Sequence, residues 1–182
     1  VGNADTQLSK NGKNIQAKIA TKGIALDRIL ANKTFGQVAT TIEMKGNKDH
    51  LVAKGEISRF DYNKYSFRNI SLDGQYNHGI VKGLASIDDP NIRVDIEGNY
   101  AMKGNKYAIN THIDHLQPSI LGVKMADKDY SLDDIDLSAN NQSSDSYLDL
   151  EAPFMSLHAR GQYNLSTLVS SIQNMIAEKL PT

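Results

Sequence analysis

The sequence predicts a mainly β fold: an extended antiparallel sheet, built from repeats, that leaves a concave apolar surface. Three observations lead to this fold class. Apolar and polar residues alternate over most of the chain, turn signals separate the alternating runs, and two sequence blocks recur in the same order. Alternation places apolar side chains on one face of a strand and polar ones on the other. We expect about ten strands joined by short turns, with short helical turns and one C-terminal amphipathic helix.

The repeat consists of two matched pairs of segments. YSFRNISL at 65–72 returns as YSLDDIDL at 130–137, and DPNIRVDIEGNY at 89–100 returns as APFMSLHARGQY at 152–163. Apolar positions are kept where the letters differ. Two blocks in register indicate structural units that stack along one axis.

These units define the expected organisation of the chain. We predict a single β-rich domain over 1–182, as a fragment of a longer chain, with repeat units at about 65–129 and 130–163. A C-terminal helix at 165–180 should cover an open end of the sheet. Its apolar stripe consists of Leu165, Leu168, Val169, Ile172, Met175, Ile176 and Leu180.

The N-terminal part reads as strands interrupted by one helical turn. Alternation predicts a first strand over 15–19 and another over 38–44, which ends at Gly46, and a third that begins at Leu51. LDRILAN at 26–32 has the spacing of one helical turn. The same order, a strand followed by a helical turn, returns at 107–113 and 115–122, where Pro118 suits the first turn.

Hairpin turns are predicted between the strands in the rest of the chain. FDYNKYSF at 60–67 carries four aromatic residues around a tight turn, which they can anchor against the sheet. Further turn signals lie at 77–79, 88–90, 103–105 and 140–146. A meander of antiparallel hairpins follows from this spacing.

Composition excludes several functional classes. The chain has 20 basic and 21 acidic residues and no basic cluster, so nucleic-acid binding has no support. It has no cysteine, which removes disulfides and thiol chemistry. We find neither an apolar run long enough to span a bilayer nor the order of a signal peptide.

No set of residues predicts catalysis, a cofactor or a metal. His112 and His115 have the spacing of a metal pair, but on a regular strand they would point to opposite faces unless a bulge intervened. The acidic run Asp127, Asp129, Asp133, Asp134 and Asp136 lacks the glycine and the closing glutamate of an EF-hand loop, which favours a solvated strand edge. Asp88 and Asp89 are expected to accept hydrogen bonds from backbone amides of a turn.

The candidate site is instead the apolar face itself. Twelve residues share the apolar parity of their strands, and we predict that they form one continuous lipid groove. They are Ile70, Leu72, Ile92, Val94, Ile96, Ile109, Ile113, Ile135, Leu137, Leu148, Leu150 and Leu157.

The order of segments resembles a known family. GEISRFDYNKYSFRNISLDGQY, then GLASIDDPNIRVDIEGNY, then a strand, a short helix and YSLDDIDL, is similar to the large AsmA-like envelope proteins of the TamB type, in the form found in Bacteroidetes. The resemblance extends from about Ile15 to Met175 and is strongest from Gly55 to Gly98.

The resemblance implies a non-catalytic role in a Gram-negative cell envelope. Proteins of this family are anchored in the inner membrane and cross the periplasm as a long repeated β-structure. The resemblance therefore implies a curled sheet, a half-pipe with an apolar trough. They are linked to phospholipid transport between the membranes and to outer-membrane protein assembly. The expected partners are phospholipid acyl chains and, through parts of the parent that are not present here, an outer-membrane barrel assembly protein. The isolated chain is also a candidate homo-oligomer.

One alternative stays open at this point. In a self-contained secreted β-sandwich, used for binding or adhesion, the same alternation would be buried by a second sheet of the chain itself. An open trough and a sealed sandwich therefore differ in whether the apolar face stays accessible.

Overall fold

The computed structural model describes residues 3–123, 130–142 and 146–161, and most of these residues lie in one antiparallel sheet. The first strands are β1 (Ala4–Asn11), β2 (Asn14–Ala25), β3 (Phe35–Gly46), β4 (His50–Tyr62), β5 (Tyr65–Phe67) and β6 (Ile70–Asn77). The remaining strands are β7 (Ile80–Asp89), β8 (Ile92–Ala101), β9 (Lys106–Leu116), β10 (Leu132–Asn140), β11 (Tyr147–Ala152) and β12 (Met155–Arg160). The α-helical turn α1 (Leu26–Ile29) and the 3-10 turn η1 (Pro118–Leu121) connect strands.

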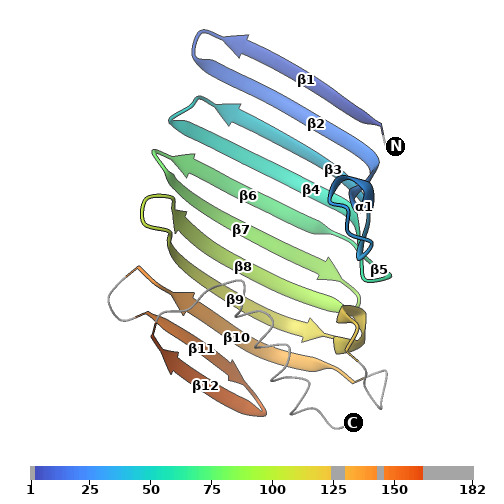
Figure 1. Cartoon of the computed structure of the whole chain (residues 1–182), viewed down its shortest axis with the longest axis vertical. Coiled ribbons are helices and arrows are strands. Elements are labelled where there is room, and N and C mark those ends of the chain that lie inside the picture. The colour runs from blue at the N-terminus through green and yellow to red at the C-terminus, as the bar shows by residue number, and fades with distance from the viewer. Residues whose placement is uncertain (1–2, 124–129, 143–145, 162–182) are drawn as a thin grey trace.

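The sheet is a meander that does not close on itself. Its strands follow the order β1-β2-β3-β4-β6-β7-β8-β9-β10-β11-β12, with β5 paired to β4 beside this path. Figure 1 shows the strands side by side along the longest axis of the molecule, with α1, β5 and η1 at one end of the strands. The predicted fold class, a mainly β, curled antiparallel sheet, is confirmed.

Local sequence explains the turns. Asn63 and Lys64 both have positive φ, 49° and 69°, in the turn that returns β4 into β5. His78 and Gly79 have the same conformation, at 45° and 86°, between β6 and β7. Two successive residues with positive φ form the tight turn whose twist matches that of the flanking strands. Aromatic contacts anchor the first of these turns, since the Tyr65 and Phe67 rings meet edge to face with centroids 4.8 Å apart.

The two matched blocks share a backbone feature that supports the repeat. Asn69 and Asp134 hold the same position in YSFRNISL and YSLDDIDL, and both have positive φ, 51° and 59°. Each is followed by a buried isoleucine of the apolar face, Ile70 or Ile135. The predicted boundaries of the repeat units stay predictions, and the predicted helix at 165–180 lies outside the described residues.

Candidate functional site

Strand register decides which side chains share a face. Residues directly opposite each other on neighbouring strands project to the same side of a sheet. Leu72 on β6 pairs with Ala85 on β7, and Ala85 pairs with Ile96 on β8. Continuing this register across the sheet places all twelve predicted groove residues on one face.

One end of this face is closed by the chain itself. Nine residues form a buried cluster, here called the closed end. They are Phe67, Ile70, Ile92, Val94, Leu116, Ile120, Leu132, Ile135 and Leu150. Phe67 comes from β5, which pairs with β4, and Ile120 comes from η1, so these two short elements each add a side chain to the buried cluster at one end of the longer strands. Six of the twelve predicted groove residues are buried: Ile70, Ile92, Val94, Ile135, Leu148 and Leu150.

Buried hydrogen bonds to the Asp89 carboxylate, here called the polar knot, stabilise the closed end. The Asp89 side chain is only 2% exposed, and its carboxylate accepts hydrogen bonds from the Tyr65 hydroxyl and from the backbone amides of Arg68 and Asn91, both at 3.0 Å. Burial, and then the hydrogen bond to Asp89, raise the pKa of Tyr65. The turn role expected for Asp89 is therefore confirmed, with the addition that its side chain is buried.

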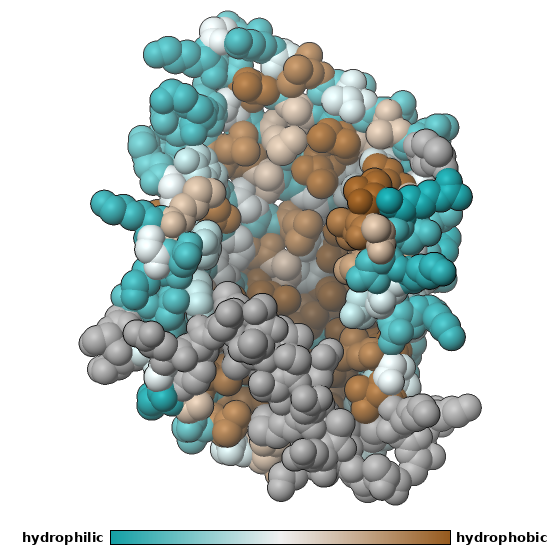
Figure 2. Space-filling view, viewed as in Figure 1, coloured by the Kyte–Doolittle hydropathy of each residue, from teal (hydrophilic) through white to brown (hydrophobic). Residues whose placement is uncertain are grey.

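Beyond the closed end the same face is open around three residues, while a second buried cluster of Tyr107, Ala139 and Leu148 lies further along it. Leu72 and Ile96 are 38% and 36% exposed, and Tyr100 is 38% exposed. The remaining predicted residues, Ile109, Ile113, Leu137 and Leu157, are half-buried. Figure 2 shows apolar side chains gathered in a hollow between polar margins.

The open stretch is a groove of about 520 Å³ that reaches from β3 to β9. Leu72, Ile96 and Ile109 of the predicted set line it. Sequence reasoning missed its other members, among them Ile42, Val81, Tyr100 and Tyr107 and the glycines Gly74, Gly83 and Gly98. Their strand parity could have identified them, because Gly74 and Gly98 lie two residues after Leu72 and Ile96.

The opposite face carries charge. Lys54 and Asp73 pair across β4 and β6 at 3.0 Å, and Lys18 pairs with Glu43 at 2.6 Å. A second hollow, of about 1050 Å³, lies there and is lined by these side chains. A twisted sheet is saddle-shaped and is therefore hollow on both faces. Since ion pairs in the open are hydrated, we take this second hollow as solvated surface.

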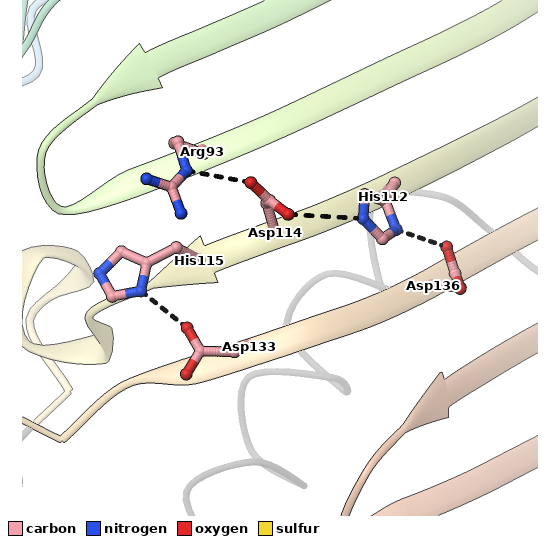
Figure 3. Close-up of polar contacts among 6 residues, drawn as sticks. All are labelled: Arg93, His112, Asp114, His115, Asp133 and Asp136. Carbon is pink, nitrogen blue, oxygen red and sulfur yellow. Dashed lines mark hydrogen bonds and ion pairs between the residues drawn. The ribbon is translucent and has the colours of Figure 1, made fainter.

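The histidines correct one sequence prediction. His112 and His115 were expected on opposite faces, but a bulge between β8 and β9 puts Asp95 opposite His112 and Arg93 opposite His115. Asp95 and Arg93 share a face, so both histidines lie on the polar side, where Figure 3 shows them. Residues three apart on a regular strand face opposite sides of the sheet. A bulge adds one residue to the strand, so His112 and His115 face the same side.

Both histidines pair with carboxylates of β10. His112 Nδ1 lies 2.8 Å from Asp136, and His115 Nδ1 lies 2.7 Å from Asp133 (Figure 3). The hydrogen bond to Asp136 raises the pKa of His112, and the hydrogen bond from His115 lowers the pKa of Asp133. Of the acidic run, Asp127 and Asp129 lie outside the described residues.

A metal could be considered where His112, Asp134 and Asp136 each offer one ligand atom within 4.8 Å of the others. Asp134 and Asp136 are exposed, and His112 Nδ1 already pairs with Asp136 at 2.8 Å. Exposed acidic groups are common without an ion, so this spacing alone does not define a metal site.

Over the residues that the structure describes, fold and groove together define an open β-sheet protein with one sheet and a partly exposed apolar face. No model of a known protein family matches the chain, and neither the curated proteins nor the solved structures contain a match. Among the described residues, no helix has the length and apolar character needed to cross a membrane.

Proposed function

We propose that this chain is a non-catalytic segment of a periplasmic bridge, of the TamB/AsmA-like type, whose apolar groove carries phospholipid acyl chains between the two membranes. The observation that carries the proposal is the exposure of Leu72, Ile96 and Tyr100 on an apolar face that the chain buries at the closed end. Contiguous exposed apolar surface bordered by polar residues is typical of a binding surface.

An acyl chain suits this groove better than a polar ligand does. The large side chains that the register places on this face of the groove are aliphatic or aromatic, whereas the charged side chains of Lys54–Asp73 and Lys18–Glu43 project to the other face. A groove that runs across strands from β3 to β9 has the elongated form of a hydrocarbon chain. Hydrophobic transfer stabilises such a complex in proportion to the apolar area removed from water.

The other function considered is a secreted β-sandwich for binding or adhesion. A sandwich core needs a second sheet packed at about 10 Å on the first. The strands in the part of the chain that the structure describes form one sheet only, and this favours the conduit. The location in the periplasm, the inner-membrane anchor of the parent and a role in outer-membrane protein assembly rest on the sequence resemblance and belong to the same proposal.

Photo-crosslinking in cells tests the conduit. A photoreactive residue at Ile96 in the full-length parent should form phospholipid adducts, because this side chain is on the open stretch. The same residue at Asp95 should form none, because Asp95 projects to the polar face. A folded, active parent that gives no lipid adduct at Ile96, or equal adducts at both positions, would overturn the proposal.

A further inference from the structure

Three glycines stand side by side in the open stretch. Register pairs Gly74 on β6 with Gly83 on β7, and Gly83 with Gly98 on β8. Ala53 on β4 is opposite Gly74 and extends the row by one strand. Because paired residues project to one face, this row, here called the glycine row, is a line of missing side chains across the apolar face.

Packing does not require these glycines. None of the three has the positive φ that excludes other residues, unlike Gly79 in the turn between β6 and β7. A Cβ on Gly74 or Gly83 would have its nearest neighbour at 3.8 Å or 3.4 Å, and one on Gly98 at 3.5 Å, which are ordinary contact distances. Glycine weakens a strand interior, and it often marks a place where another molecule approaches the backbone closely.

Side chains rise on both sides of the row. Leu72 and Ile96 lie two residues before Gly74 and Gly98, and Tyr76 and Tyr100 lie two residues after them. Each wall is therefore about 7 Å from the row along the strand. From Ala53 on β4 to Gly98 on β8 the row crosses three strand spacings, or about 14 Å, and β9, which carries Tyr107, lies one spacing further, about 19 Å from β4. The result is a furrow, narrow between its walls and long across the strands, within the 520 Å³ groove.

A second observation points to a ligand with a polar end. Tyr107 on β9 lines the same groove and is 5% exposed. Within the described ranges, its hydroxyl makes no hydrogen bond, whereas its backbone amide donates to Asn141 Oδ1 at 2.6 Å. A buried tyrosine hydroxyl usually finds a partner. Tyr107 lies at the β9 side of the furrow, opposite Tyr100.

We propose that the glycine row seats one unbranched acyl chain, which lies across the strands with its polar end at the Tyr107 hydroxyl. This inference rests on the proposed function and adds the class of chain that the groove selects. A fully extended chain advances about 1.2 Å per bond, as an extended backbone does, so 19 Å corresponds to about 16 bonds. A straight chain keeps contact with the floor along its length, whereas each methyl branch lifts it and loses dispersion contacts.

Two fatty acids of equal main-chain length, one unbranched and one branched, test this selectivity. Hexadecanoic acid is unbranched, and phytanic acid is a hexadecanoic chain with four methyl branches. Equilibrium dialysis of the purified chain against each acid should give at least fivefold tighter binding of hexadecanoic acid. Equal affinity for the two acids would overturn the selectivity and leave the conduit proposal standing. Binding of neither acid would overturn both proposals.

Filling the furrow should abolish the preference. Gly83→Val places a side chain on the floor and suits a strand better than glycine does, so thermal stability should be unchanged or raised while hexadecanoic acid binds at least tenfold more weakly. The matched control is Lys82→Val, which adds the same side chain to β7 on the polar face and should change the affinity less than twofold. If Gly83→Val fails to fold, Gly83→Ala, whose Cβ has room, is judged by the same preference for the unbranched acid.

Tyr107→Phe tests the polar end separately. Loss of the hydroxyl should weaken both acids severalfold by a similar factor and leave their affinity ratio unchanged. A merely structural Tyr107 would lower thermal stability without altering the affinity of the folded protein. Unchanged affinity in Tyr107→Phe, or wild-type affinity in a folded Gly83→Val, would overturn the assignment of the chain to the glycine row.

Discussion

Two stretches of the same apolar face differ in what covers them. On β8, Val94 is 7% exposed at the closed end, and Ile96, two residues further, is 36% exposed. On β6 the neighbours Ile70 and Leu72 are 8% and 38% exposed. All four are large aliphatic residues of one parity, so composition does not explain the difference. The short elements β5 and η1 do, because they lie at one end of the strands (Figure 1), where Phe67 and Ile120 pack in the closed end.

The largest loss of stability is expected when a charge is placed in the closed end and not in the open stretch. Val94→Asp buries a carboxylate without a partner in the closed end and should lower the free energy of unfolding by about 3–5 kcal/mol. Ile96→Asp keeps its charge near water and should cost about 1 kcal/mol or less. Urea denaturation of both variants measures the difference. Equal losses would mean that the open stretch is a sealed core.

Loss of the polar knot should lower the free energy of unfolding nearly as much as Val94→Asp does. Asp89→Ala leaves the amides of Arg68 and Asn91 and the Tyr65 hydroxyl without their buried acceptor, and we expect a loss of about 2–3 kcal/mol in the free energy of unfolding. Asp88→Ala, at the exposed neighbour, is the control and should change stability by less than about 0.5 kcal/mol. A comparable loss in both variants would remove the knot as the cause of closure.

A smaller loss of stability tests whether the two matched blocks, 65–72 and 130–137, are structurally equivalent. Asn69 and Asp134 hold left-handed backbone directly before the buried Ile70 and Ile135. Alanine tolerates this conformation poorly, so Asn69→Ala and Asp134→Ala should each destabilise the chain by about 1 kcal/mol. Glycine at either position should recover most of that loss. Thermal melts decide it: if alanine is harmless at one site only, the two blocks are not structurally equivalent.

The sequence predicts the face but not its closure. Alternation identified the strands and the shared parity of residues such as Ile96 and Val94, because parity is a local property. Which of them is sealed depends on the three residues of β5 and on the Asp89 knot, whose contacts join residues far apart in the chain. The bulge that brings His112 and His115 to one face was missed for the same reason, since it is a property of pairing between β8 and β9.

The smallest effect is expected on the polar face, at His112. His112 is opposite Asp95, which separates Val94 from Ile96 on β8, and its hydrogen bond to Asp136 raises its pKa above the usual value. Because the folded state holds this proton more tightly, the stabilisation is full below the unfolded pKa of about 6.5 and is lost as pH rises through the folded pKa. Titration followed by NMR should show the raised pKa of His112, and Asp136→Asn should return it toward 6.5. Exposed pairs of this kind contribute little, so the urea midpoints of the wild type and of Asp136→Asn should nearly coincide above neutral pH. A large shift there would mean that the polar face, and not only β5 and η1, helps to close the apolar one.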